Sequence, residues 1–420
     1  MTAPSHRFYY GWVIVAVSCF TLAVALGIRW SFGVFYVSIL NEYGWGRAET
    51  AGAFSLGMLI HGFFAPVTGT IIDRFGPRWL FPLGALFLSI CLVAASYTQT
   101  VWQLYLYFGM VIGIGINTLS YSPHMSLIPK WFIRRRGFAA GLVLAGMGLG
   151  SMFMAPLVEV MIASVGWRNA LLILAACVLC ILVPVTAIFQ RRSPDEVGQY
   201  PDGVATNVCQ EKSPKAPNRN TRILWTLRDA LCTGPFWWLF LTITCHGFII
   251  NMLVVHQMVH VVDMGYSAIM AASLLGMVGL LGSIGGILCG SFSDRVGREV
   301  ACTYGSLCAI MGVLFLVLAG YIQSTWLLYG FVLLYGFGQG ALGPVTATTT
   351  GDLFPGNSLG RIFAVMTMGF GVGSAFGAYI GGYFYDLTGS YLIPFMLVLG
   401  SIVVAALGIW MAAPRRLRVV

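Results

Sequence analysis

Residues 69–78 read Gly-Thr-Ile-Ile-Asp-Arg-Phe-Gly-Pro-Arg, and residues 290–299 read Gly-Ser-Phe-Ser-Asp-Arg-Val-Gly-Arg-Glu. Both stretches follow a long apolar run and share glycine, aspartate and arginine at the same spacing, with Glu299 in place of the last arginine. A positively charged loop would explain the arginines, but it would not explain aspartate and glycine at fixed positions. The sequence therefore predicts an internal repeat, with one copy of the stretch in each half.

Long apolar runs surround both copies. The chain has 420 residues, of which 58% are hydrophobic and only 9% are charged, whereas about 25% of the residues in a soluble domain are charged. A helix that crosses a bilayer needs about 20 apolar residues, and the runs between charge clusters predict twelve such spans in an all-α polytopic membrane protein that lies in a lipid bilayer. The predicted spans cover approximately residues 11–38, 50–72, 79–98, 101–128, 137–163, 167–189, 235–260, 266–292, 301–322, 325–350, 359–385 and 390–412.

One hydrophilic stretch divides the spans six and six. Residues from about Arg191 to Asp229 are rich in Pro, Asn, Lys and Asp, a composition typical of flexible linkers. We predict an N-terminal six-helix bundle over residues 1–190, a cytoplasmic linker over 191–234 and a C-terminal six-helix bundle over 235–420. Two parallel repeats related by a pseudo-twofold axis along the membrane normal are an architecture of transporters.

The distribution of positive charge predicts the orientation. The formal net charge is +9, but Lys and Arg gather between apolar runs and not along an aromatic-rich stripe, which argues against nucleic-acid binding. With a cytoplasmic N-terminus, every Lys and Arg except Arg29, Arg47 and Arg168 falls on the cytoplasmic side. Because cytoplasmic loops carry the excess of positive charge, we expect both termini in the cytoplasm and the protein in the plasma (inner) membrane. The first apolar run is too long for a cleavable signal and is expected to remain as a span.

Enzymatic chemistry has no signature in the sequence. The ten cysteines lie mostly inside apolar runs, and no phosphate-binding G-x-x-x-x-G-K-[ST] loop occurs. We therefore expect no enzyme, no cofactor and no metal site.

The repeated stretch resembles the loop signature of the major facilitator superfamily. Three further stretches are similar to the monocarboxylate transporter and oxalate/formate antiporter families: residues 10–13 (Tyr-Gly-Trp-Val), residues 33–50 and residues 131–141, which read Trp-Phe-Ile-Arg-Arg-Arg-Gly-Phe-Ala-Ala-Gly. The resemblance implies alternating-access transport of a small organic monocarboxylate, lactate-like or aromatic, by a protein that can work as a monomer. Proton symport is the expected coupling, because a proton and a monoanion together carry no net charge. Organic anion exchange and drug/proton export are the alternatives, and a transporter-like sensor would need an output module that the linker and tail do not offer.

Arg29 is the candidate for binding the carboxylate. The resembling families usually carry a substrate-binding arginine in span 8, four residues before the motif glycine, but this chain has Gly286 there. Arg29 is instead the only Lys or Arg well inside a span. A charge at that depth is costly unless it faces protein or a water-filled cavity, and a guanidinium fork suits a carboxylate. The alternative is an arginine that reaches the membrane interface or caps backbone carbonyls.

Polar side chains in three other spans predict the rest of a central cavity. In span 4 they recur at helical spacing on one face, in span 10 the repeat places an amide opposite Asn117, and span 7 adds a histidine and an asparagine. The predicted substrate-binding residues are Arg29, Asn117, Tyr121, His246, Asn251, Tyr335 and Gln339. Because imidazole titrates near neutral pH, His246 and His124 are the candidates for proton coupling. Hydrogen bonds between helices are the alternative role for these side chains.

The repeated stretches also predict a cytoplasmic gate. Asp73 can pair with Arg361 at the start of span 11, and Asp294 can pair with Arg136 at the start of span 5. These pairs would hold the cytoplasmic side shut in the outward-facing state. The predicted gate comprises Asp73, Arg74, Arg78, Arg136, Asp294, Arg295, Arg298 and Arg361.

Overall fold

The computed structural model describes residues 9–203, 225–355 and 358–412, apart from the side chain of Asp73. The described residues form helices and no strands, and twelve helical segments are long and apolar enough to cross a membrane, as the sequence predicts. The candidate spans are Gly11–Tyr43, Arg47–Ile72, Pro77–Ser96, Val101–Trp131, Arg136–Val165, Trp167–Phe189, Gly234–Asp263, Ala268–Val296, Arg298–Ile322, Thr325–Leu353, Leu359–Thr388 and Leu392–Ala412.

The first six spans contain several interruptions. Ser31 separates α1 from α2, and π-helical turns at Val111–Gly115 and Val178–Leu182 divide spans 4 and 6. The helices of this half are α1 (Gly11–Trp30), α2 (Phe32–Tyr43), α3 (Arg47–Phe75), α4 (Pro77–Ser96), α5 (Val101–Met110), α6 (Ile116–Thr118), α7 (Tyr121–Trp131), α8 (Arg136–Val165), α9 (Trp167–Cys177) and α10 (Val183–Phe189).

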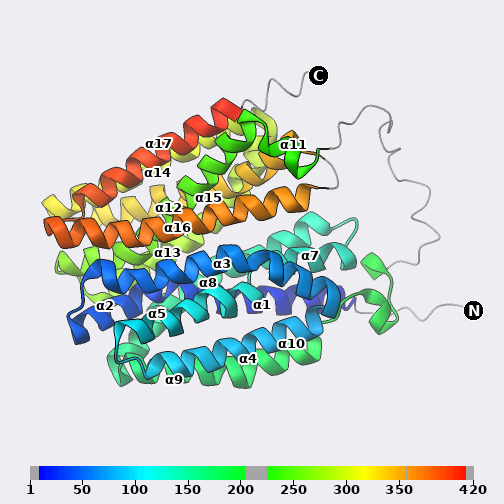
Figure 1. Cartoon of the computed structure of the whole chain (residues 1–420), viewed down its shortest axis with the longest axis horizontal. Coiled ribbons are helices and arrows are strands. Elements are labelled where there is room, and N and C mark those ends of the chain that lie inside the picture. The colour runs from blue at the N-terminus through cyan, green and yellow to red at the C-terminus, as the bar shows by residue number, and fades with distance from the viewer. Residues whose placement is uncertain (1–8, 204–224, 356–357, 413–420) are drawn as a thin grey trace, which may run out of the picture.

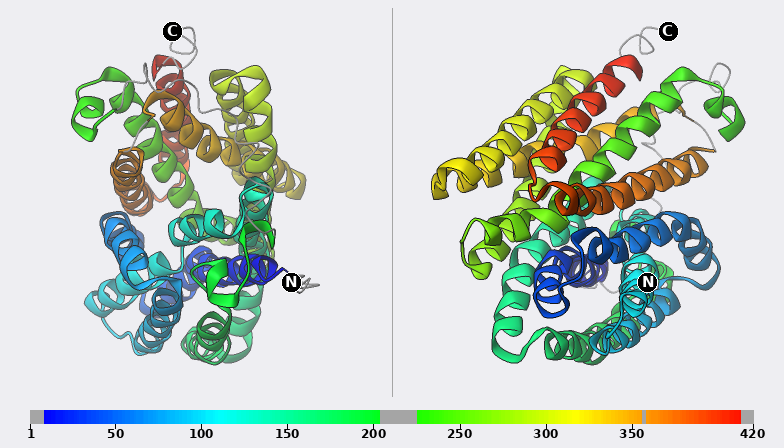
Figure 2. Two further views of the ribbon diagram at one scale, coloured as in Figure 1. Left: turned by 90° about the vertical axis from the view of Figure 1, so that its right-hand side faces the viewer. Right: turned by 60° about the vertical axis from the view of Figure 1, so that its left-hand side comes forward.

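The last six spans are continuous helices preceded by a short one. They are α11 (Leu227–Leu231), α12 (Gly234–Asp263), α13 (Ala268–Val296), α14 (Arg298–Ile322), α15 (Thr325–Leu353), α16 (Leu359–Thr388) and α17 (Leu392–Ala412). Figure 1 shows helices α1 to α10 in one half of the molecule and α11 to α17 in the other, and Figure 2 shows the same division from two further sides. The long helix α16 lies along α3, and α13 lies along α8.

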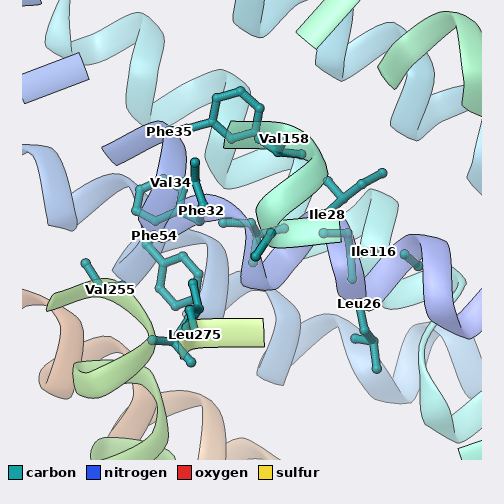
Figure 3. Packing of buried hydrophobic residues seen from close by; sticks show 14 of the residues in the cluster. Leu26, Ile28, Phe32, Val34, Phe35, Phe54, Ile116, Val158, Val255 and Leu275 are labelled. Atoms are coloured by element: carbon teal, nitrogen blue, oxygen red, sulfur yellow. The ribbon is translucent and has the colours of Figure 1, made fainter. Parts of the chain in front are cut away.

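The core continues from one half into the other. Figure 3 shows Phe54 of α3 beside Val255 of α12 and Leu275 of α13, all of which are buried. The backbones also approach closely there, because a Cβ placed on Gly33 of α2 would lie 2.6 Å from the carbonyl oxygen of Val254. The two halves therefore form one packed interface in this region.

The spanning helices begin and end at two opposite ends of the molecule. At the end that we call the terminal end, α1 begins, α3 and α15 end, and α8 and α16 begin. At the opposite end, which we call the Arg47 end, α2 and α12 end and α3 and α13 begin. Helix α1 begins and α17 ends at the terminal end (Figure 1).

Part of the predicted linker is folded onto the first half. The side chain of Asp202 accepts hydrogen bonds from the backbone N–H groups of Ile133 (3.0 Å) and Arg134 (2.8 Å), and Gln199 accepts one from Tyr10 N–H (3.0 Å). Its composition predicts flexibility for this segment, but 3₁₀ turns at Pro194–Val197 and Pro201–Gly203 hold it against the loop before α8. Residues 204–224 of the predicted linker lie outside the described residues.

Candidate functional site

The two halves touch from mid-depth to the Arg47 end and separate toward the terminal end. A Cβ on Gly62 of α3 would lie 3.2 Å from the Cα of Gly371 on α16, and one on Gly148 of α8 would lie 2.7 Å from the hydroxyl of Ser283 on α13. Residues seven apart lie on nearly the same face of a helix. One such step toward the terminal end, a Cβ on Gly69 or Gly141 would meet no described atom within 4 Å. The facing surfaces of the two halves therefore move apart between the middle of the molecule and the terminal end.

Arg29 points into the protein near this divergence. Ala16 and Phe20 form the exposed face of α1, and the helical spacing places Arg29 on the opposite face, where it is half-buried. Its guanidinium makes no hydrogen bond or ion pair with another described residue, and it lies within electrostatic range of the ring of His61 on α3. The Nδ1 atom of His61 is buried and has no partner among the described residues. The predicted cation thus has an imidazole neighbour that the predicted site omitted.

His246 and Gln339 come together in the second half. The ring of His246 on α12 interacts with the backbone carbonyl of Gln339 on α15, and it lies 5.8 Å from the ring centroid of Phe370 on α16. Its Nε2 atom is buried without a partner among the described residues. Phe370 directly precedes Gly371, which meets Gly62 of α3, and Gly62 directly follows His61 in the sequence.

The site therefore has one unpaired cation and two imidazole nitrogens that lack partners. A buried polar atom without a partner costs about 1–3 kcal/mol, so the arrangement favours a bound polar group. A guanidinium attracts an anion and can hold a carboxylate through two parallel hydrogen bonds. The imidazoles can donate to that anion or carry a proton.

Two predicted residues bond neighbouring helices. Asn117 accepts a hydrogen bond from the hydroxyl of Thr68 (2.6 Å) and donates to the carbonyl of His61 (2.8 Å), which ties α6 to α3. Asn251 donates to the hydroxyl of Ser374 (2.7 Å), which ties α12 to α16. Asn117 and Asn251 thus form hydrogen bonds between helices, which is the alternative role given above. They support α3 and α12, the helices that carry His61 and His246.

The predicted polar stripe on span 4 is wrong as a continuous face. The helix is interrupted at Leu119 and Ser120, where the backbone leaves helical geometry before α7 begins. As a result Tyr121 is 47% exposed, whereas His124 is fully buried and stacks on Phe81 of α4 with the ring centroids 4.4 Å apart. The helix period of 3.6 residues does not apply across such a break, so His124 does not share a face with Asn117.

Tyr335 packs inside the second half, and its buried hydroxyl has no hydrogen-bond partner among the described residues. It stacks on Phe331 with ring centroids 5.3 Å apart, and its backbone fits against Gly312 of α14. Helix α15 therefore uses this position to pack within the second half.

The two predicted gate pairs lie at the terminal end, and the structure describes both side chains of only one of them, Asp294 and Arg136. Asp294 bonds Arg298 (2.5 Å) within its own repeat stretch, and Arg298 also bonds Asp352 (3.3 Å). Arg136, the predicted partner of Asp294, is exposed. The pair of Asp73 with Arg361 lies outside what the structure describes, and Arg74, Arg78, Arg295 and Arg361 are exposed. Because the halves are apart at this end, the predicted gate stays a prediction for a state in which they meet.

A second charged group, which the site prediction omitted, joins the halves at the Arg47 end. The guanidinium of Arg47 on α3 bonds both carboxylate oxygens of Asp263 on α12, at 2.7 and 3.1 Å. A pocket of about 330 Å³ lies beside this pair, lined by Asn41, Trp45, Arg47, Val259, Asp263 and Asp386 among others. The sequence contained one sign of this group. Arg47 and Arg168 are the two cations predicted in the loops on the non-cytoplasmic side, and each was a candidate for pairing with an acidic residue.

Comparison with known proteins identifies the relatives of the chain. The family model of the Major Facilitator Superfamily matches residues 18–350 and 318–419. Monocarboxylate transporter 13 of Rattus norvegicus is 28% identical over 411 residues, which cover 96% of this chain and 89% of the relative. Monocarboxylate transporter 12 of Homo sapiens is 25% identical over 414 residues, which cover 92% and 77%. The fold is similar to that of a bacterial homologue of the human lysosomal transporter Spinster, solved in an inward-facing and unoccupied conformation, with a TM-score of 0.71, 15% identity and 98% of both chains covered.

Proposed function

Because this chain belongs to the major facilitator superfamily, we propose that it carries a small organic monocarboxylate, lactate-like or aromatic, across the membrane together with a proton. The chain is a membrane transporter and not an enzyme. Two six-helix bundles, residues 1–190 and 235–420, would rock about the contact of α3 with α16 and α8 with α13, joined by residues 191–234. In this proposal both termini face the cytoplasm, so the terminal end opens inward.

Arg29 is the observation that carries the proposal. It is the only Lys or Arg in the interior of a span, and it has no hydrogen-bond or ion-pair partner among the described residues. A single half-buried cation is neutralised by a single negative charge, whereas a dianion would leave one charge unpaired and a cation would be repelled. The relatives that are named monocarboxylate transporters support the same substrate class.

The two histidines support coupling to a proton. His61 on α3 and His246 on α12 each have a buried ring nitrogen without a described partner. An anion that enters a cell alone works against about 2.3 kcal/mol per charge per 100 mV of membrane potential. Carrying a proton with the anion removes that cost. We therefore propose His246 with His61 as the proton-carrying pair, with the bound carboxylate offsetting the charge of Arg29 that opposes a proton on His61. His124 stacks on Phe81 of α4 within the first half and is not part of this pair.

Organic anion exchange is the second candidate. It is favoured by the fact that Arg29 itself supplies the charge that a bound carboxylate needs, so that binding requires no proton. An exchanger would return to its other state only with an anion bound, whereas a symporter would also return empty.

Reconstituted protein distinguishes these candidates. Purified transporter is first screened by thermal unfolding with a panel of monocarboxylates, the matching amides and dicarboxylates, because a ligand at 100 times its Kd adds about 2.7 kcal/mol of stability. We expect stabilisation by monocarboxylates alone, and equal stabilisation by the amides would contradict the proposal. Uptake of the best ligand into liposomes is then measured with an inward proton gradient or with internal anion. A proton gradient that drives uptake into empty vesicles supports symport, and uptake that requires internal anion supports exchange.

A further inference from the structure

The first turn of α3 is capped by a residue of the other half. Its own N-cap residue is Gly46, which has no side chain to accept the free N–H groups. Instead the carboxylate of Asp386 on α16 accepts hydrogen bonds from the N–H groups of Arg47 (2.9 Å) and Ala48 (2.8 Å). The first N–H groups of a helix lack partners within it and carry partial positive charge. The carboxylate of Asp386 therefore caps α3 from the other half of the molecule, whereas a helix is ordinarily capped by a residue at its own start.

The absence of a side chain at Gly46 makes room for this contact. A Cβ on Gly46 would lie 3.2 Å from one carboxylate oxygen of Asp386, which is closer than ordinary van der Waals contact. On the opposite helix, a Cβ on Gly382 would lie 2.5 Å from the backbone nitrogen of Ala48. Both helices thus carry glycine where their backbones meet, and the carboxylate fits into the space.

The side chain of Arg47 adds a second connection. Its guanidinium forms the two-point ion pair with Asp263, bonds the hydroxyl of Tyr391 (2.7 Å) and lies 3.5 Å from the ring centroid of Tyr385. The Arg47 side chain is 16% exposed and that of Asp263 is 35% exposed, so the pair is partly shielded from water and stronger than an exposed pair. One residue of α3 therefore holds the ends of both α12 and α16.

We infer that Arg47, Asp263 and Asp386 form a gate that holds the Arg47 end of the transporter shut, with Asp386 acting through the first turn of α3. This inference rests on the proposed alternating-access function. When the two halves separate at this end, α3 loses the cap, Arg47 loses its partner, and both carboxylates are left in the pocket beside them. The gate therefore favours the state seen here, in which this end is closed and the terminal end is open.

Two reporter positions on one face of α3 test the gate. Ser55 is buried in the contact between the halves, where its hydroxyl donates to the carbonyl of Ala375 (2.7 Å), whereas a Cβ on Gly69 faces open space. Ser55→Cys and Gly69→Cys are each made in the full chain, labelled with a maleimide in detergent and read by peptide mass spectrometry, so that the native cysteines remain. If the gate holds the Arg47 end shut, Asp386→Ala should speed labelling at position 55 several-fold and slow it at position 69.

Matched variants complete the test. Asp263→Asn, which is nearly isosteric, should shift both reporters in the same directions even if the Asp386 variant fails to fold. Glu42→Gln is the control, because Glu42 bonds Arg168 (2.6 Å) at the same end but within the first half, and it should change neither reporter.

Unchanged labelling in folded Asp386 and Asp263 variants would overturn the inference. Faster labelling at both positions would also overturn it, because general loosening, and not a shift between two states, would then explain the result. The measurement involves no substrate, so a failure of carboxylate binding would leave its outcome intact.

Discussion

Asn117 and Gln339, which occupy matching positions in the two repeats, make matching contacts. The amide of Asn117 donates to the carbonyl of His61 on α3 at 2.8 Å, and the amide of Gln339 donates to the carbonyl of Val278 on α13 at 3.2 Å. Helices α3 and α13 each carry one copy of the repeated charged stretch at their terminal ends. The repeat therefore extends from the loops into the hydrogen bonds of the buried core.

These contacts predict that both amides act mainly on stability. Asn117→Ala and Gln339→Ala each remove the donor to a buried carbonyl, so we expect the free energy of unfolding to fall by about 1–3 kcal/mol. Chemical unfolding in detergent measures it, and binding of the best monocarboxylate should weaken little in the protein that remains folded. Full stability with lost binding would instead place these amides against the substrate.

The glycine contact between the halves gives a second prediction. A side chain at Gly371 would meet the carbonyl oxygen of Met58 at 2.9 Å and the Cα of Gly62 at 3.0 Å, and neither backbone atom can rotate away. Gly371→Val should therefore force α16 away from α3 and abolish transport in reconstituted vesicles. Gly141→Val is the control, because its Cβ faces open space. It should retain most activity, and equal loss in both variants would argue that any bulk on these helices is harmful.

The sequence predicted the spans because hydropathy depends on local composition. It also predicted that Gln339 matches Asn117, because the internal repeat places span 10 where span 4 lies, and both amides donate to a neighbouring helix. It did not predict the break at Leu119 and Ser120, where local backbone geometry overrides the helical period. The stripe that included His124 failed for this reason.

Contacts between the two halves could not be predicted from one sequence. Asp386 and Arg47 are 339 positions apart, and nothing local to either residue indicates the other. Gly46 has no side chain to cap the start of α3, but this does not indicate which residue does so. The predicted site omits His61, because a single histidine in an apolar span gives no sign that an arginine on another helix lies near it.

Asp294 provides a third prediction, for the terminal end. It bonds Arg298, which is 7% exposed and retains Asp352 as a second partner. If Asp294 engages Arg136 when this end closes, Asp294→Asn should destabilise the closed state, speed maleimide labelling of Gly69→Cys and slow transport with little loss of binding. Asp195→Asn, at an exposed position beside the same end, is the control. Normal transport by the Asp294 variant would mean that the repeated stretch shapes the loop and does not gate.

The last prediction concerns Arg29, because every other aspect of the substrate proposal depends on its charge. Arg29→Gln keeps hydrogen-bond donors but loses the charge and the planar fork, so the affinity for a monocarboxylate should fall by about 1.5–3 kcal/mol, or roughly tenfold to a hundredfold in Kd. Arg29→Lys should restore only part of the loss, since an ammonium cannot form two parallel hydrogen bonds to one carboxylate. Arg168→Gln is the matched control, because Arg168 bonds Glu42 at the Arg47 end, and the affinity of this variant for the monocarboxylate should stay unchanged.

Isothermal titration of the folded variants measures each Kd. Because the wild-type guanidinium has no described partner to lose, the Gln variant should also be at least as stable as the wild type without ligand. A Gln variant that binds the acid with wild-type affinity would show that Arg29 does not hold the carboxylate, and the two histidines would then be the remaining donors at the site.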